Sequence, residues 1–359
     1  MVNRACLGLS WAAIALALAT YAQDPPTTQP GNELRAVQEK PALTDDDRQI
    51  IRRVIDRRVA DIVAGTPGPA LSQLREDAKG SNAYREAYAA ALIDGVGQTY
   101  KTAKLVPGTQ LIALLGSLNE AVTQRVLIEA LSDKRPAVRT AAAIGLRNLH
   151  AKLAQLGGAY FTDTLSALKE AGKAESSTVA LKAIYQALNF AEGGATSPDV
   201  KANAAALLEV LEDRATRQYA AGAVRAEGAD TVGIQALSTL KAGLTDAERD
   251  RGTIAVGKII SRAVTIYANE LAGSKGALTG AATERRNGYE QLIEECERVL
   301  IDQLKPKTVP TLTKTMQSSE GSNKSTDMKN QMKEWAKILE EKFNQKFFTD
   351  ADAAVGGTP

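Results

Sequence analysis

The chain has 359 residues with 44 basic and 42 acidic side chains, a formal net charge of +2, and this near-neutral balance argues against a nucleic-acid-binding protein. Hydrophobic residues make up 44% of the chain but aromatic residues only 4%, and a single histidine excludes metal sites built from several histidines. Alanine and leucine supply most of the apolar content, which favours an all-α fold.

Residues 1–22 have the three parts of a secretory signal peptide. Arg4 gives a short positively charged start, an apolar run follows, and Thr20 and Ala22 are small residues before the predicted cleavage after Ala22. We therefore expect a periplasmic or secreted protein with no membrane span after cleavage. The alternative is an uncleaved membrane anchor, although the apolar run is short for a span.

The segment 23–43 contains four prolines and few apolar residues, which predicts an extended linker. From Thr44 to residue 304, apolar residues recur with helical spacing, and no stretch is typical of a strand. Thr44 is a suitable N-cap for the first helix, which is predicted to end at Gly65. The region 44–304 is therefore predicted to be one helical domain.

The middle of this domain is predicted to consist of helix pairs, with turns at glycine, proline, aspartate or serine positions. The pairs are 83–104 with 108–117, 120–132 with 136–153, 160–172 with 176–191, 200–212 with 214–226, and 230–242 with 245–271. A further helix over 283–304 is predicted to close the array.

One pair, residues 126–149, carries a recognisable pattern. Asp133 and Pro136 lie in its turn, and Val138, Arg139 and a run of alanines follow in its second helix. The order of these residues resembles a HEAT repeat. The resemblance implies a HEAT-like α-solenoid of stacked antiparallel helix pairs, in which Asp133 and Arg139 join neighbouring repeats through hydrogen bonds.

Beyond residue 304 the composition changes. Residues 305–326 are rich in Ser, Thr, Lys and Gly and are predicted to be a linker, followed by an extra amphipathic helix over 327–348 and a disordered tail over 349–359. The stripe on this helix consists of Met328, Met332, Trp335, Leu339 and Phe343. Because it is too apolar to remain exposed, we expect it to dock on the same chain or on a partner.

The second helices of the last four predicted pairs are rich in basic residues. If these helices line one side of the array, they form a basic groove with focused positive potential. The residues expected to face this groove are Arg139, Arg147, Lys182, Arg217 and Arg225. The alternative is that these charges are ordinary solubilising groups.

The sequence contains no set of residues typical of a catalytic, cofactor-binding or metal site. GxSxG, phosphate-loop, HExxH and CxxC motifs are all absent. His150 is expected to be partly exposed near the end of a helix, and Cys296 to be a small helical residue whose acidic neighbours raise its thiol pKa. No metal or cofactor is therefore expected.

Together these features predict an exported, non-catalytic scaffold or adaptor that presents a concave, partly basic helical surface to an extended protein or anionic polymer. Nucleic acid is not the expected partner, because the chain is exported and has few aromatics for base stacking. One alternative is an exported α/α-type hydrolase or lyase that acts on an anionic polymer through two distant carboxylates. Another is an accessory subunit of an envelope complex, connected through the C-terminal helix.

Overall fold

A computed structural model describes residues 30–65, 67–189, 198–218, 227–273, 280–318 and 324–348. Throughout these ranges the fold is all-α and contains no β-strand. The predicted signal peptide 1–22, the predicted tail 349–359 and Arg225 lie outside the described residues.

The helices follow one another through short connections. In chain order the α-helices of the described ranges are α1 (Pro30–Gln38), α2 (Asp45–Ala64), α3 (Pro67–Asp77), α4 (Asn82–Thr102), α5 (Leu105–Ser117), α6 (Gln124–Ala130), α7 (Pro136–Leu156), α8 (Gly158–Ala174), α9 (Thr178–Leu188), α10 (Pro198–Asp213), α11 (Glu227–Leu240), α12 (Asp246–Gly273), α13 (Gly280–Leu304), α14 (Leu312–Gln317) and α15 (Lys324–Phe343). Short turns of 3-10 helix, η1 (Ala121–Thr123) and η3 (Lys241–Gly243), and of π-helix, η2 (Arg214–Gln218), adjoin some of them.

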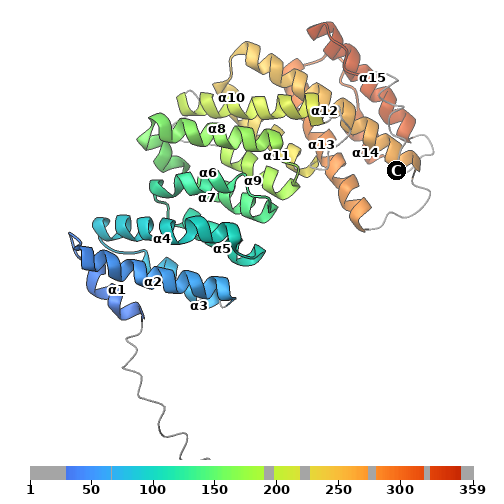
Figure 1. Ribbon diagram of the computed structural model, residues 1–359. Helices are drawn as coiled ribbons and strands as arrows, with labels where there is room; N and C mark the ends of the chain where they lie inside the picture. Colours follow the sequence, from blue (N-terminus) through green and yellow to red (C-terminus); the bar gives the residue numbers. More distant parts are fainter. Residues whose placement is uncertain are drawn as a thin grey trace, which may run out of the picture.

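The helices lie in two rows along the molecule (Figure 1). In what we call the second row, α3, α5, α7, α9, α11 and α13 pack each on the next. In the first row, α2 packs on α4, and α6, α8, α10 and α12 pack each on the next. Each first-row helix also packs on the second-row helix that follows it in the chain, and α14 and α15 pack on α13 and α12.

The helix pairing predicted after residue 200 is wrong. Arg214–Gln218 continues α10 as a π-helical turn, and the rest of the helix predicted over 214–226 lies outside the described residues. Arg214 is 1% exposed, and its guanidinium binds the carboxylate of Asp230 in α11. This buried ion pair joins α10 to α11, so the helix predicted over 230–242 is the second-row partner of α10. Helix α12, which was predicted to pair with it, packs on α13 instead.

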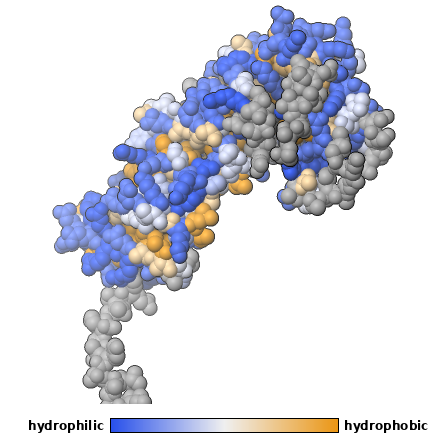
Figure 2. Space-filling model, turned by 45° about the vertical axis from the view of Figure 1, so that its right-hand side comes forward, coloured by the Kyte–Doolittle hydropathy of each residue, from blue (hydrophilic) through white to orange (hydrophobic). Residues whose placement is uncertain are grey.

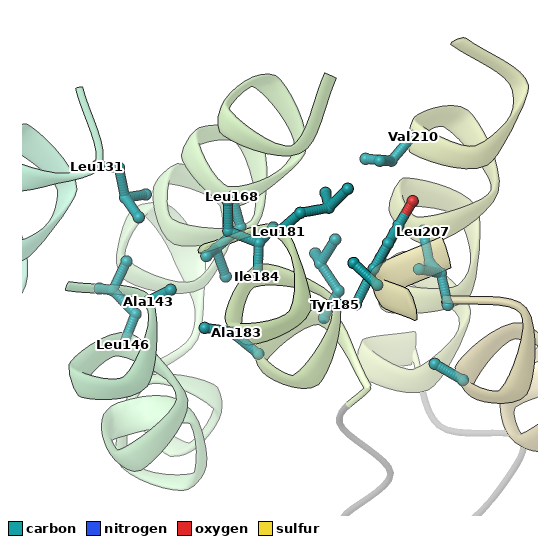
Figure 3. Close-up of a cluster of buried hydrophobic side chains, with 14 of the residues drawn as sticks. Leu131, Ala143, Leu146, Leu168, Leu181, Ala183, Ile184, Tyr185, Leu207 and Val210 are labelled. Carbon is teal, nitrogen blue, oxygen red and sulfur yellow. The ribbon is translucent and has the colours of Figure 1, made fainter. Parts of the chain in front are cut away.

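The apolar core is continuous along the rows. Buried side chains form one cluster from Leu34 in α1 to Phe348 near the C-terminus. Figure 3 shows a part of this cluster, in which Leu146 of α7, Ile184 of α9 and Leu207 of α10 lie between successive helices. Each helix therefore buries apolar surface against neighbours on both sides, and this burial supplies the main stabilisation.

Helices α5 and α7 meet through their backbones. A Cβ atom added to Gly145 would lie 2.9 Å from the Cα atom of Gly116, and one added to Gly116 would lie even closer to Gly145. Neither position has room for a side chain. The close approach leaves a shallow groove between the outer faces of the two helices.

Two segments predicted to be linkers contain packed helices. Helix α1 lies within 23–43, and its Leu34 and Val37 are buried. Helix α14 lies within 305–326, and its Leu312 and Met316 are buried. In both segments, one or two apolar residues at helical spacing are enough to dock a short helix on the larger array.

The C-terminal helix is shorter than predicted. It ends at Phe343, because Asn344 adopts a left-handed conformation with φ of 54°. Phe347 and Phe348 follow outside the helix but are buried, and a Cβ atom on Gly257 of α12 would lie 2.9 Å from the Phe347 ring. The chain therefore folds back onto α12 after the helix ends.

Candidate docking surface

The turn between α6 and α7 is held by two arginines. Arg139 donates from Nε and Nη2 to the carboxylate of Glu175 (2.6 and 2.7 Å), and from Nη1 to the carbonyl oxygen of Asp133 (2.8 Å). Glu175 lies just before α9, so Arg139 connects two successive helices of the second row. Pro136 begins α7, and Val138 is completely buried.

The Asp133 carboxylate binds the side chain of Arg135, a residue that the sequence pattern did not indicate. The Asp133 carboxylate accepts from the backbone N–H and from Nε of Arg135 (2.8 Å each), and the guanidinium holds the pKa of Asp133 below its usual value. Arg135 also donates to the carbonyl oxygens of Tyr100 and Ala103 at the end of α4 (2.8 and 2.7 Å). These contacts satisfy carbonyls that the end of the helix leaves without partners.

The residues predicted to face a basic groove do not share one row. Arg147 lies on α7 and Lys182 on α9, both exposed on the second row. Arg217 lies instead in η2 at the end of first-row α10, where it binds Asp213. Arg139 is in the second row, but its guanidinium is engaged by Glu175.

The charge of the second row changes along its length. Helices α5, α7 and α9 contain no acidic residue, whereas α13 contains six acidic and three basic residues. The three helices carry four basic residues, Arg139, Arg147, Lys152 and Lys182. The positive charge of the second row is therefore concentrated on α7 and α9.

Most cations near these helices are already paired with carboxylates. Lys152 binds Glu120 (2.6 Å) and Lys101 binds Glu129 (2.5 Å). Within the described ranges no carboxylate pairs with Arg147 or Lys182, and Arg147 donates to the neutral side chain of Gln186 (3.1 Å). These two exposed side chains keep an unneutralised positive charge.

Apolar side chains lie exposed on the same helices. Leu105 and Val106 of α5 are 52% and 59% exposed, Ile144 of α7 is 39% exposed, and Val179 of α9 is 65% exposed. Figure 2, in which the right-hand side of Figure 1 comes forward, shows hydrophobic surface in the N-terminal half of the molecule. Sequence periodicity did not reveal this patch, because an exposed leucine or valine on an apolar helix has the same spacing as a buried one.

A groove of about 370 Å³ lies within this patch. Thr109, Ala113 and Gly116 of α5 line one side, Ala141 and Ile144 of α7 line the other, and Val179 of α9 lies at its edge. The lining is mostly apolar and small, as expected where two glycines bring the helices together. We call the surface formed by this groove, Leu105, Val106, Arg147 and Lys182 the α5–α9 face.

The C-terminal stripe lies inside the protein. Met328, Met332, Trp335 and Leu339 are completely buried against neighbouring helices of the same chain, and Phe343 is partly exposed. The Trp335 indole N–H donates to Oε1 of Glu297 in α13 (2.9 Å). The same carboxylate accepts from the backbone N–H groups of Leu312 and Thr313 (2.9 and 2.7 Å).

Another cleft, of about 580 Å³, lies between α3, α4 and the turn after α5. Two carboxylates line it, and both are in ion pairs. Glu76 binds Lys79 (2.8 Å), and Glu120 binds Lys152 (2.6 Å).

His150 is buried, which corrects the expectation of partial exposure. It is 2% exposed, and its ring lies 5.6 Å from that of Phe161 of α8. Burial lowers its pKa from 6.5 to about 4. Cys296 is also completely buried, and burial together with nearby Glu295 raises its thiol pKa.

In the part of the chain that the structure describes, no group of three His, Cys, Asp or Glu side chains is placed to hold a metal ion. No helix of that part is both long and apolar enough to span a bilayer. No family model and no curated protein matches the chain.

Proposed function

We propose that this protein is an exported, non-catalytic scaffold of HEAT-like α-solenoid architecture that binds an extended partner on the α5–α9 face. The proposal rests on one observation: the second-row helices α5, α7 and α9 combine an apolar groove with two exposed cations, Arg147 and Lys182, that no carboxylate of the described residues neutralises. Exposed apolar patches larger than a few hundred Å² are rare on monomeric proteins and mark interaction sites or ligand-binding grooves.

The packing of the helices supports the solenoid part of the proposal. Helices α7 and α9 run parallel, since Arg139 of α7 binds Glu175 before α9, and Arg147 further along α7 binds Gln186 further along α9. Repeating units that contact mainly their neighbours are typical of solenoids, which use one row of helices as a long binding surface.

The catalytic alternative has less support. An exported hydrolase or lyase needs carboxylates that are free to act on a substrate, but the carboxylates that line the 580 Å³ cleft and a second cleft of about 370 Å³ at the end of α10 are all in ion pairs. The pairs are Glu76–Lys79, Glu120–Lys152, Glu209–Lys169, Glu212–Arg251 and Asp213–Arg217. A connector role for the C-terminal helix is also less supported, because its apolar stripe is buried against the chain itself.

Affinity capture from a cell-envelope extract tests the binding proposal. Wild type is compared with Ile144→Glu/Val179→Glu, which places charge in the groove, and with Val122→Glu/Leu156→Glu as a control at exposed apolar residues elsewhere. We expect proteins captured by wild type and the control to be lost from the groove variant. Equal capture by all three proteins would remove the α5–α9 face from the function.

Export is tested separately, by the mass of the mature N-terminus. We expect the chain to start at Gln23, after cleavage at Ala22. A chain that still begins at Met1 in the membrane fraction would support the uncleaved anchor instead.

A further inference from the structure

The α5–α9 face has a chemical character that specifies the kind of partner more closely. We infer that it binds an amphipathic peptide segment whose apolar side chains enter the groove and whose Asp or Glu side chains reach Arg147 and Lys182. This inference rests on the proposed function, and it names the class of ligand for the same surface.

The groove favours apolar side chains in the ligand. Its walls are formed mostly by small or aliphatic side chains, with Asn148 as the largest polar one, and its floor is the glycine contact between α5 and α7. Such a groove accepts a leucine, isoleucine or valine side chain and offers little to a hydrated sugar. An anionic polysaccharide would leave Ile144 and Val179 exposed to water, so a peptide fits the surface better.

The charges of the face favour acidic side chains in the ligand. Arg147 and Lys182 are exposed on the adjacent helices α7 and α9, and Arg147 binds Gln186, which lies one turn after Lys182 on α9. Helices α5, α7 and α9 contain no acidic residue. The two cations therefore attract the Asp or Glu side chains of a ligand that lies in the groove.

The dimensions favour a short segment. Packed helices lie about 8–10 Å apart, so a ligand that crosses from α5 to α9 spans roughly 20 Å. An extended chain covers this distance with about six residues, at about 3.3 Å per residue. A partner therefore needs only one short segment in which apolar and acidic residues are interleaved.

Selection from a library of random 12-residue peptides, displayed on phage and applied to the full-length protein, tests the inference. We expect the enriched peptides to combine aliphatic residues with at least two Asp or Glu. An enriched peptide, labelled with a fluorophore, should bind at least tenfold more weakly to Arg147→Glu/Lys182→Glu and to Ile144→Glu/Val179→Glu. Its affinity for the control Val122→Glu/Leu156→Glu should stay within twofold of wild type.

The remaining outcomes overturn the inference. Enriched peptides without acidic residues that still need Ile144 and Val179 would leave the proposed binding face intact but refute the ligand class. Peptides whose binding is unaffected by all three variants would refute both the face and its ligand. Phosphatidylglycerol vesicles serve as a second probe. If no peptide is enriched, and if the protein binds these vesicles but the same two variants do not, the face binds a membrane surface and not a peptide. Circular dichroism confirms that each variant is folded.

Discussion

Arg139 illustrates how a single side chain joins two structural units. Its guanidinium forms two hydrogen bonds with Glu175, whose side chain is only 2% exposed, and a third with the carbonyl oxygen of Asp133. Charge-assisted pairs of this geometry are stronger than exposed ion pairs, because the buried carboxylate has no access to solvent once its partner is removed. Arg139 was expected to form hydrogen bonds, but its partner Glu175 lies 36 residues away and no local motif marks it.

We therefore predict that Arg139→Ala lowers the free energy of unfolding by about 1–3 kcal/mol. The matched control is Arg147→Ala on the same helix, which removes an exposed arginine bound to Gln186 alone and should change stability by less than about 0.5 kcal/mol. Urea unfolding followed by circular dichroism measures both values. Similar losses in the two variants would show that Arg139 contributes no more than a surface residue.

His150 provides a prediction about pH. Its pKa is about 4 in the folded protein because burial disfavours the charged imidazolium, whereas an exposed histidine in the unfolded chain titrates near 6.5. Between these values the unfolded state binds more protons, so the stability contributed by neutral His150 is complete above pH 6.5 and is lost as the pH falls toward 4. The expected loss is on the order of 3 kcal/mol.

The measurement is the free energy of unfolding in urea at several pH values between 7 and 4, for wild type and His150→Leu. Absolute stabilities can differ, since the variant changes packing as well as charge. The slope with pH is the informative quantity, and it should be shallower in the variant over this range. Parallel pH profiles would mean that His150 becomes protonated in the folded protein without cost.

At the scale of elements, the contact between α5 and α7 depends on glycine. Gly145→Ala would place a methyl group against the backbone of Gly116 and against Leu127, so we predict a loss of about 1–3 kcal/mol through overpacking. Gly97→Ala in α4 is the matched control, because nothing lies within 4 Å of its added Cβ atom. Since alanine favours helix more than glycine does, this control should gain about 0.5–1 kcal/mol. Thermal or urea unfolding measures whether each variant is more or less stable than wild type. A Gly145→Ala variant that is more stable than wild type would contradict the close contact.

The helices themselves could largely be predicted from the sequence, but their pairing could not. Pro136 at the start of α7 was placed correctly, because proline at the first position of a helix is a strong local indication. The pairing failed at Arg214, where α10 continues into a π-helical turn and the side chain reaches Asp230 in the next helix. No local pattern distinguishes a buried arginine that extends a helix from an exposed one that begins a new helix. The helix pairs predicted after this point are therefore displaced by one helix, and Arg217, which was expected on a second-row helix, lies at the end of first-row α10.

The candidate surface was predictable only in part. Arg147 and Lys182 were selected from the sequence because acidic residues are missing around them, and both are exposed on the second row. The apolar groove beside them depends on the approach of Gly116 to Gly145, a tertiary contact between residues 29 positions apart. Periodicity assigns each apolar residue to a helix face, but it does not show which faces another helix will cover.

At the scale of the whole molecule, extensive contacts join helices that are close in chain order. In such an array the stability is approximately a sum of local units and their interfaces, so distant parts need not unfold together. Trp335 lies at the C-terminal end, completely buried, and it is the one tryptophan after residue 22. In a chain that begins at Gln23, its fluorescence therefore reports on the C-terminal helices, while circular dichroism reports on all helices.

Two variants, one in α7 and one in α13, test whether the two parts of the molecule unfold separately. Gly145→Val should weaken the α5–α7 interface, so that the circular dichroism transition begins at lower urea while the midpoint of the Trp335 transition stays within about 0.2 M of wild type. Glu297→Ala should have the reverse effect, because it leaves the indole N–H of Trp335 and the backbone N–H groups of Leu312 and Thr313 without their acceptor. It should lower the midpoint reported by Trp335 more than the dichroism midpoint, whereas the control Glu294→Ala at an exposed position of α13 should change neither. If both variants instead shift the two transitions together, the core that runs from Leu34 to Phe348 unfolds as one cooperative unit, and independent local units do not describe this protein.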